Sequence, residues 1–396
     1  MLFPVAARAP FSLLAALMLV RLTDEWYSFL PVGAIVPIRD HLDLTYAQVG
    51  LVLISLPAGG IAGHGFTIAA DFVSRRAIAT FGAFALGACM IAFALADSFI
   101  VLIVAGVAWG SASDAFVHGC EVALVDVSRD DLAPALARVN AYSSIGDLLG
   151  PATLIAAAAL GIEWRAVFAA GGGAMLLYGA WLATLRFPPP QPPDHAPTPL
   201  AGVLSVLRDR RIIVLALVDG LYGLLDEPFF GFTLAYLDDV RGLSQAVANA
   251  IVGAGVLGGL CGFLAVPALT PRMSRRRLML VTGAITGMAI ALLIAVPFAP
   301  LQAAAAFVFG FAGATFYSVL QASYLGLRPG QAGTTGAVVS TIGLAGVGFP
   351  VLVGAVADAH GLTAGLALYA VVPVAMVALL FIGNAGEERS SESIAG

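Results

Sequence analysis

The feature that most constrains this chain is a succession of apolar runs, each long enough to cross a lipid bilayer. A membrane-spanning helix needs about 20 predominantly apolar residues, and twelve stretches of the sequence meet that requirement. They cover residues 11–37, 46–70, 77–97, 99–125, 134–160, 163–186, 212–237, 246–270, 278–297, 301–326, 333–357 and 363–384. These runs predict an all-α membrane protein with twelve transmembrane helices.

Composition excludes the soluble classes. Sixty per cent of the 396 residues are apolar and only 11% are charged, whereas soluble domains carry about 25% charged residues. A soluble enzyme or a nucleic-acid-binding protein of this length would need far more polar surface. The three cysteines lie inside apolar runs without metal-ligand spacing, so no metal site or disulfide framework is predicted from them.

A proline-rich segment divides the runs into two groups of six. Residues 188–197 contain six prolines and are too polar to span a membrane. We therefore expect an N-terminal six-helix bundle over residues 1–187 and a C-terminal six-helix bundle over residues 212–386. Between them, residues 188–211 are expected to form a linker followed by a short amphipathic surface helix. Residues 387–396 are predicted to be a disordered tail.

The arginines predict how the chain is oriented, because loops on the cytoplasmic side of a membrane carry an excess of positive charge. All 19 basic residues are arginine. If both termini lie in the cytoplasm, the cytoplasmic loops and tails carry Arg8, Arg75, Arg76, Arg129, Arg138, Arg186, Arg208, Arg210, Arg211, Arg272, Arg275, Arg276, Arg277, Arg328 and Arg389. The opposite side has only Arg39, Arg165 and Arg241. This asymmetry predicts a multi-pass protein of a cell (inner) membrane with cytoplasmic termini and a cytoplasmic linker.

Two acidic pairs suggest that the halves are related. Asp24-Glu25 lies near the middle of the first run, and Asp226-Glu227 lies near the middle of the seventh. Adjacent carboxylates within hydrocarbon are rare because each is costly there. Two such pairs at matching places indicate parallel half repeats joined by a linker, which is the layout of many secondary transporters.

The loop between the second and third runs carries a family resemblance. Asp71, Arg75 and Arg76 match a glycine-x-leucine-x-aspartate-arginine loop that ends in basic residues, although Thr67 and Phe72 replace its glycine and first arginine. In these residues the chain resembles the major facilitator superfamily. The resemblance implies two pseudo-symmetric six-helix bundles, transport by alternating access, and a gating contact made by this loop.

A second motif lies in the fifth run. Gly146, Gly150 and Pro151 resemble the glycine-xxx-glycine-proline core that is typical of drug/proton antiporters, without its flanking glycines. The segment Leu44 to Gln48 is similar to the fosmidomycin-resistance branch. Small residues spaced four apart also serve plain helix packing, so a structural role for Gly146 and Gly150 is as plausible as a mechanistic one.

Charged residues inside the runs are the candidate site, because such residues usually mark a substrate or proton path. They are Arg21, Asp24 and Glu25 in run one, Asp114, His118 and Glu121 in run four, Asp147 in run five, and Asp226 and Glu227 in run seven. His64 in run two and Asp219 in run seven are weaker candidates. The family resemblance implies that helices one, four, seven and ten line a central cavity, and most of these charges fall on three of those four.

Run four offers the most specific pattern. At about 100° per residue, Asp114, His118 and Glu121 lie on one narrow stripe, with Ser111 extending it. Histidine titrates near neutral pH, and desolvation shifts carboxylates toward that range. The stripe is therefore predicted to relay protons; the alternative is a polar network that is satisfied within the bundle.

The other charges leave alternatives open. Arg21 is expected to pair with either Asp24 or Glu25 from the preceding turn, leaving the other carboxylate to bind a proton or a cation. No arginine is near Asp226 and Glu227, so one of them is expected to be protonated or exposed to cavity water. Asp147 could extend the relay or bond backbone groups freed by the kink.

Aromatic and amide side chains could complete the cavity wall. The candidates are Trp26, Tyr27, Phe229, Phe230, Tyr317 and Gln321. If these aromatic residues line the cavity, they suit a hydrophobic or cationic ligand. The alternative is that they belong to the apolar core.

The excess of membrane carboxylates disfavours an anionic substrate, which would need cationic groups. The sequence therefore predicts a proton-coupled secondary transporter, monomeric and not an enzyme, that exports small amphipathic neutral or cationic compounds. The alternatives are a divalent metal-ion transporter that uses the Asp/His/Glu cluster, or a lipid or lysolipid transporter. No cofactor or nucleic-acid partner is expected, and no GxxxxGK[ST] loop for ATP is present.

Overall fold

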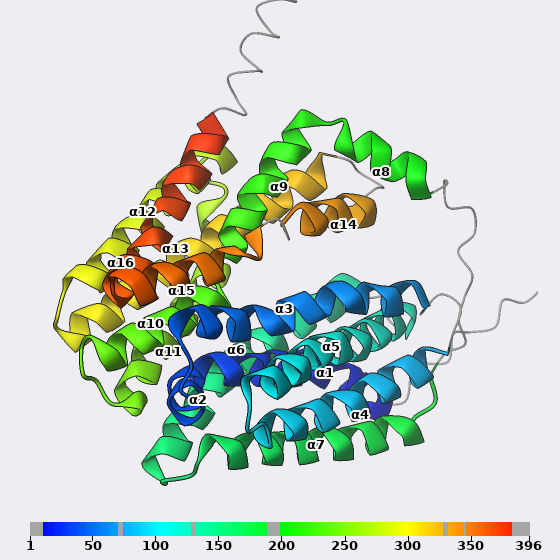
Figure 1. Ribbon diagram of the computed structural model, residues 1–396. Helices are drawn as coiled ribbons and strands as arrows, with labels where there is room; N and C mark the ends of the chain where they lie inside the picture. The colour runs from blue at the N-terminus through cyan, green and yellow to red at the C-terminus, as the bar shows by residue number, and fades with distance from the viewer. Residues whose placement is uncertain are drawn as a thin grey trace, which may run out of the picture. The chain divides into compact units, whose positions relative to one another are not determined.

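The computed structural model describes residues 11–69, 74–127, 132–187, 199–327, 332–343 and 346–381, and every regular element within these ranges is a helix (Figure 1). The predicted all-α fold is therefore confirmed. Within the described residues, seven helical segments are long and apolar enough by themselves to cross a membrane, and shorter apolar helices lie in three of the other predicted runs, at Tyr46–Gly60, Ile145–Ala159 and Phe349–His360.

The first half follows the predicted runs. Its helices are α1 (Phe11–Gly33), α2 (Ile35–Leu42), α3 (Tyr46–Ala69), α4 (Arg75–Ala94), α5 (Phe99–Val127), α6 (Leu132–Ala159) and α7 (Trp164–Thr184). The end of the first run was predicted wrongly. Helical structure does not stop near residue 37 but continues as α2 to Leu42, because a slight break at Ala34 is followed by renewed backbone bonding.

The second half contains more interruptions than predicted. Its elements are α8 (Pro199–Leu207), α9 (Arg210–Gly223), α10 (Glu227–Asp239), α11 (Gln245–Leu269), α12 (Arg275–Ala295), α13 (Ala299–Gly326), α14 (Ala332–Gly343), α15 (Phe349–His360), α16 (Leu362–Ala367) and the 3₁₀ turn η3 (Leu368–Ala370), followed by helical residues 371–381. The expected surface helix is α8, which ends before Arg210 begins α9.

The seventh run was expected to be one helix, and this prediction is wrong. Helix α9 ends at Gly223, and α10 begins only at Glu227, with Asp226 as its N-cap residue. Proline fits the first turn of a helix, where its missing N–H costs nothing, but not a helix interior. Pro228 therefore explains why a new helix begins at this point, even though Leu224 and Leu225 are as apolar as the rest of the run.

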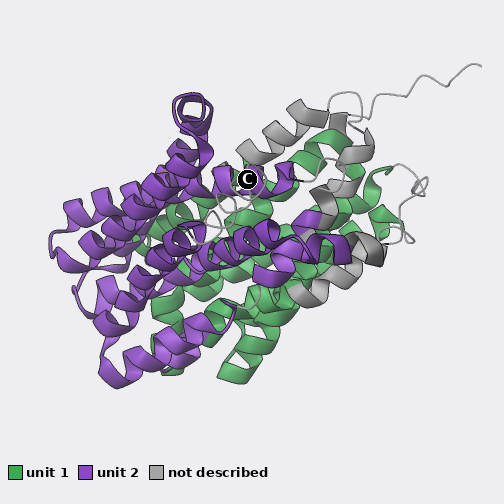
Figure 2. Ribbon diagram, turned by 90° about the horizontal axis from the view of Figure 1, so that it is seen from above, with its two compact units in different colours: residues 1–44, 51–193 green, residues 45–50, 194–396 purple. Residues whose placement is uncertain are grey.

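The described residues fall into two compact units (Figure 2). Unit 1 contains residues 1–44 and 51–193, and unit 2 contains residues 45–50 and 194–396. The division does not follow the chain strictly, because the first turn of α3 is grouped with unit 2. The proline-rich segment 188–198 and the predicted tail lie outside the described residues.

Each unit has its own aromatic core. In unit 1, Phe93 on α4 and Phe168 on α7 stack with centroids 5.3 Å apart, and Trp109 on α5 packs edge-on to both. In unit 2, Phe229 on α10 lies 4.6 Å from Phe309 on α13 and 5.2 Å from Tyr369. These rings bury large apolar areas, which fixes how the helices of each unit pack.

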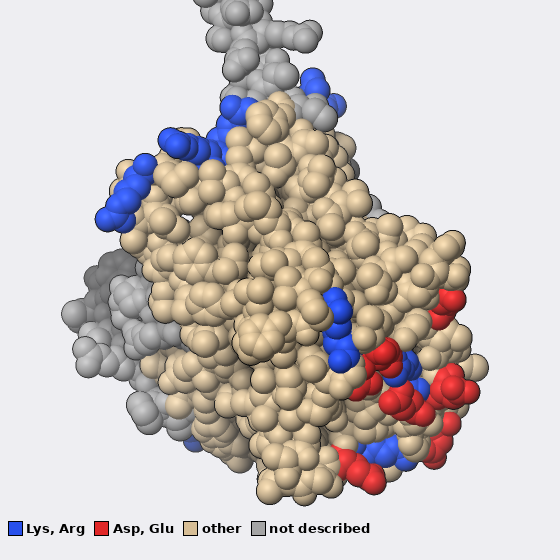
Figure 3. All heavy atoms as spheres, turned by 90° about the vertical axis from the view of Figure 1, so that its left-hand side faces the viewer, with Lys and Arg blue, Asp and Glu red and all other residues tan. Residues whose placement is uncertain are grey.

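The surface suits a bilayer. Large apolar side chains such as Leu177 on α7 and Leu264 on α11 are about three-quarters exposed, at 74% and 73%. Figure 3 shows a face on which most charged side chains gather toward two ends, with a broad stretch of uncharged residues between them. An apolar surface of this extent is stable in contact with hydrocarbon rather than water.

Candidate functional site

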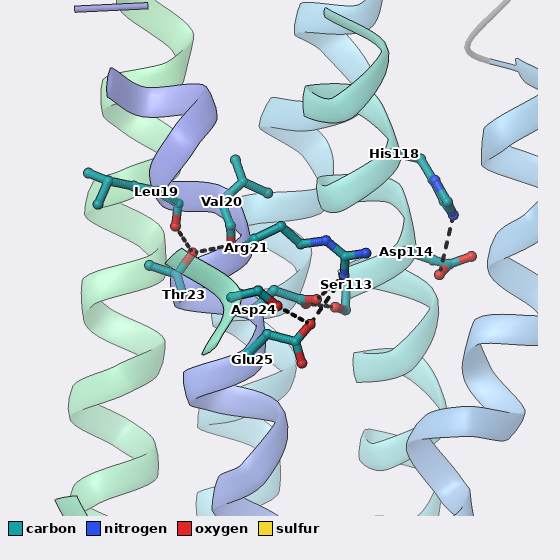
Figure 4. Close-up of polar contacts among 10 residues, drawn as sticks. Leu19, Val20, Arg21, Thr23, Asp24, Glu25, Ser113, Asp114 and His118 are labelled. Atoms are coloured by element: carbon teal, nitrogen blue, oxygen red, sulfur yellow. Dashed lines mark hydrogen bonds and ion pairs between the residues drawn. The ribbon is translucent and has the colours of Figure 1, made fainter. Parts of the chain in front are cut away.

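The strongest polar network of unit 1 is centred on Arg21 in α1 (Figure 4). Its Nη1 atom lies 3.5 Å from Asp24 Oδ2 and 3.4 Å from Glu25 Oε1. The guanidinium reaches both carboxylates because they follow it by three and four residues, one helical turn away. The expectation that Arg21 pairs with only one of them is therefore wrong.

Two serines complete this Arg21 network. Ser113 Oγ on α5 donates to Asp24 Oδ1 in a short hydrogen bond, and Ser143 Oγ on α6 donates to Glu25 Oε1 at 3.0 Å. The side chain of Asp24 is 11% exposed and that of Glu25 is 28% exposed. Asp24 is thus the enclosed member of the pair, and Glu25 is the more accessible one.

Glycines of α6 bring α6 and α1 close enough for this network. A Cβ atom at Gly146 would lie 2.4 Å from the Leu22 carbonyl oxygen, and one at Gly150 would lie 2.6 Å from Phe29 Cβ. Both distances are too short for a side chain. The antiporter-like motif, which includes Pro151 inside α6, therefore serves close packing directly beside the charged groups.

Asp114 and His118 form a separate pair on another side of α5. His118 Nε2 lies 3.7 Å from Asp114 Oδ1, and Figure 4 shows both side chains pointing away from Asp24 and Glu25. Ser111 on the same stripe donates to the Gly59 carbonyl of α3 at 2.8 Å. Ser111 and Asp114 of the predicted stripe thus face α3, while the neighbouring Ser113 faces α1.

Other predicted residues of unit 1 are more scattered. Trp26 Nε1 donates to Thr153 Oγ1 on α6 at 2.8 Å, and its ring stacks on Tyr27, which is buried. Tyr27 is therefore a core residue and does not line an accessible wall. Asp147 is partly exposed on α6, directly after Gly146, and its part in a proton relay stays a prediction.

Some of the predicted site residues lie outside the described part of the chain. Asp71 lies outside the described residues, and the side chains of Glu121 and His64 are also outside them. Of the loop arginines, Arg75 is buried, and Arg76 is exposed and donates through Nη2 to the Ala183 carbonyl at the end of α7 in a short contact. The gating contact expected for this loop remains a prediction.

In unit 2 the notable group is Asp226, at the break between α9 and α10. Its side chain is exposed and does not cap the helix that it precedes. No basic residue occurs between residues 212 and 240. Asp226 is thus a carboxylate in the middle of an apolar run without a cationic neighbour in sequence, while Glu227 begins α10 and is favoured by the positive end of that helix.

Tyrosines gather next to Asp226. Tyr222 on α9 stacks on Tyr317 of α13 with ring centroids 5.0 Å apart. Asp219 and Asp226 lie close enough to interact electrostatically with the Tyr222 hydroxyl. Tyr324 lies close enough to the Asp219 carboxyl to interact with it, and Gln321, which is exposed, lies beside Tyr324. Asp219 Oδ1 is buried and has no hydrogen-bond partner among the described residues.

Several residues of these networks were not predicted from the sequence. Tyr222 lies four residues before Asp226, one helical turn away, and this spacing could have drawn attention to it, whereas Ser113 and Ser143 are common small side chains that give no such signal. Phe229, proposed as cavity lining, is fully buried in the aromatic core of unit 2, and Phe230 packs against Phe309 in the same cluster.

A metal centre finds no support in the described part of the chain. Within the described residues, no group of three or more His, Cys, Asp and Glu side chains lies close enough together to hold a metal ion. Asp114 and His118 supply two donors, and a stable site for a divalent ion needs more.

Comparison with known proteins identifies the fold. A family model described as Major Facilitator Superfamily matches residues 14–350. The chain belongs to the major facilitator superfamily. This superfamily assignment makes it a multi-pass integral membrane protein that transports small molecules, rather than an enzyme.

Solved structures of other members of the major facilitator superfamily resemble it throughout. A bacterial homolog of the human lysosomal transporter Spinster, in an inward-facing and occupied conformation, matches with a TM-score of 0.76 and 16% identity over 94% of this chain and 96% of that one. The nucleoside transporter NupG matches with a TM-score of 0.75 and 16% identity over 94% and 98%. At these identities the likeness shows the fold alone. No curated protein matches the sequence.

Proposed function

We propose that this member of the superfamily couples proton movement to the export of small amphipathic compounds that are neutral or cationic. The observation that carries the proposal is the exposed Asp226 carboxylate at the break of the seventh run, beside the stacked Tyr222 and Tyr317. Keeping a carboxylate at that depth is costly, which is explained if a substrate cation or a proton neutralises it during transport.

The surroundings of Asp226 favour an organic cation. A carboxylate supplies the counter-charge, and tyrosine faces attract positive charge through their quadrupoles. No arginine or lysine lies in residues 212–240 to bind a phosphate or carboxylate group. Unit 2 therefore provides the substrate-binding groups in this proposal.

The Arg21 network provides the proton site. When Glu25 accepts a proton, Arg21 and Ser143 lose an ionised partner, while the contact of Arg21 with Asp24 is retained. Glu25 is the carboxylate that a proton from solvent reaches more easily, because its side chain is more than twice as exposed as that of Asp24, 28% against 11%. A change of one charge beside Gly146, where α1 and α6 are in close contact, would favour a rearrangement of these two helices.

The direction of transport rests on the antiporter-like motif in α6, formed by Gly146, Gly150 and Pro151. In this proposal the protein exchanges protons for substrate across a cell (inner) membrane, with both termini in the cytoplasm as the arginine distribution predicts. The divalent-metal alternative has less support, because the described residues bring no suitable ligand cluster together.

The test uses purified protein in proteoliposomes that contain a pH-sensitive dye. Tetraphenylphosphonium, an apolar organic cation, is added with and without an imposed pH gradient, and proton movement is recorded. The parent protein is expected to move protons when the cation is added. Asp226→Asn should abolish this response, and Glu227→Gln, the matched control one residue away, should retain most of it.

Binding is measured in parallel on the same variants. Asp226→Asn should weaken tetraphenylphosphonium binding about tenfold, which corresponds to the loss of one charge-assisted contact. If Asp226→Asn binds and transports the cation as the parent does, Asp226 is not the substrate carboxylate. A response to divalent manganese but not to the organic cation would instead favour the metal-ion alternative.

A further inference from the structure

A groove on the outer surface of unit 1 is not explained by transport. It lies between the beginning of α4 and the end of α7 and has a volume of about 410 Å³. Arg76 lies at its polar end, Thr80 and Ala183 line its middle, and Phe81 and Phe84 form its apolar wall. Figure 1 shows α4 and α7 running side by side, and the two helices pack against each other along their length.

The wall of the groove belongs to the bilayer-facing side of α4. Ala77, Phe81, Phe84, Ala88 and Leu95 are all exposed and follow one another at helical spacing. Phe81 is 55% exposed and Phe84 is 39% exposed, and α4 is apolar enough to span a membrane. Such a stripe is stable only against hydrocarbon, so the apolar part of the groove opens toward lipid chains.

The other end of the groove is cationic. Arg76 is exposed in the first turn of α4, where the N–H groups of the helix end favour anions. One N–H group of Arg76 donates to the Ala183 carbonyl, and the guanidinium has further donors. None of the described residues that line the groove is acidic, and the buried Thr80 Oγ1 has no hydrogen-bond partner among them or elsewhere in the described part of the chain.

We propose that this groove binds an anionic phospholipid, with the phosphate at Arg76 and an acyl chain across Phe81 and Phe84. A phosphate is the group that a guanidinium binds best, through parallel hydrogen bonds. A positive group beside an apolar, bilayer-facing wall is complementary to a phospholipid, which joins a negative phosphate to hydrocarbon chains.

The test is native mass spectrometry of delipidated, full-length protein titrated with lipid. Phosphatidylglycerol, which is anionic, is compared with phosphatidylcholine, which is zwitterionic, and with inorganic phosphate alone. The parent is expected to bind one phosphatidylglycerol molecule more tightly than further copies. Arg76→Ala should weaken this first binding step about fivefold or more. This is the change in affinity that corresponds to the attraction of one basic residue to an anionic lipid surface.

Three further variants make the result decisive. Arg76→Lys should keep part of the preference because it keeps the charge. Phe81→Ala with Phe84→Ala should weaken the binding of both lipids. Arg277→Ala is the matched control, because Arg277 is also exposed in the first turn of a helix, α12, but does not line the groove.

The proposal fails if Arg76→Ala and Arg277→Ala bind phosphatidylglycerol with equal affinity, or if phosphatidylcholine binds the parent as tightly. It also fails if inorganic phosphate alone competes for the site at the same concentration as the lipid, since the acyl chain would then contribute nothing. If Arg76→Ala does not fold, the lysine variant and the phenylalanine double variant decide the question.

Discussion

Arg21 is the one basic residue of α1, which also contains the carboxylates of Asp24 and Glu25. It lies within 3.5 Å of two carboxylates, and each of these receives a further hydrogen bond from a serine on a different helix. The reach of Arg21 to Asp24 and Glu25 could be predicted from helical spacing. The serine partners could not, because serines in apolar runs carry no signal of what lies opposite them.

We expect Arg21→Gln to lower the free energy of unfolding by about 1–2 kcal/mol, because two adjacent carboxylates lose their common counter-charge. The figure is at the low end for charged hydrogen bonds, since the Arg21 side chain is 34% exposed and partly screened by solvent. Thermal unfolding of the purified protein in detergent measures the change.

Adding Glu25→Gln to this variant should recover part of the loss, because it removes one of the two uncompensated charges. If Arg21→Gln unfolds at the same temperature as the parent, the guanidinium does not stabilise α1.

At the scale of elements, glycine decides how closely α1 and α6 approach each other. A Cβ atom at Gly146 would meet the Leu22 carbonyl at a distance that admits no side chain, whereas a Cβ atom at Gly173, in the middle of α7, would have nothing within 4 Å. Both glycines lie inside helices of the same unit. They therefore form a matched pair that separates packing from helix propensity.

Gly146→Ala is expected to cost about 1–3 kcal/mol, because it forces α6 away from α1. Gly173→Ala should be neutral or stabilising by up to about 1 kcal/mol, since alanine favours helix over glycine where space allows. Parallel unfolding curves of the two variants measure the difference. Equal effects would mean that α1 and α6 tolerate a wider separation than the structure shows.

The helices also show how much of the fold can be predicted from the sequence. The runs predicted the helices well because length and apolar content are read directly from the residues. The break before α10 was missed because the residues at the break are leucines, and Pro228 alone does not say whether a helix kinks or restarts. Which face of a mostly apolar helix points inward is equally hard to predict, as Tyr27 and Phe229 show.

At the scale of the whole molecule, the beginning of α3 is hydrogen-bonded to a residue near the other end of the chain. Asp358 on α15 accepts hydrogen bonds from the backbone N–H groups of Tyr46 and Ala47, at 2.8 and 2.9 Å, although more than 300 residues separate them in the chain. The Tyr46 hydroxyl also donates to Asp239 at 2.7 Å. The distant Asp358 carboxylate thus bonds the first two amides of α3, and the local N-cap residue Thr45 accepts from the third, the Gln48 N–H, at 3.2 Å.

Asp358→Ala should expose the first amides of α3, at a cost of about 1–2 kcal/mol, the usual value of a lost N-cap. Hydrogen exchange measured by mass spectrometry should show faster exchange in residues 46–50. Tyr46→Phe, which removes the hydroxyl that bonds Asp239 and leaves the backbone amides in place, should keep those amides protected. Unchanged exchange in the alanine variant would show that the capping contact does not order α3.

The three arginines predicted to lie on the non-cytoplasmic side each donate hydrogen bonds to other groups of the protein. Arg165 donates to the Ala96 carbonyl and to Asp97, Arg241 donates to the Ile294 carbonyl at 2.5 Å, and Arg39 bonds Asp40. Ala96 and Ile294 lie at the ends of α4 and α12, where carbonyls have no partner within the helix. In the predicted orientation these positive charges have to cross the membrane, and the hydrogen bonds of Arg165 and Arg241 to two helix ends would offset part of that cost.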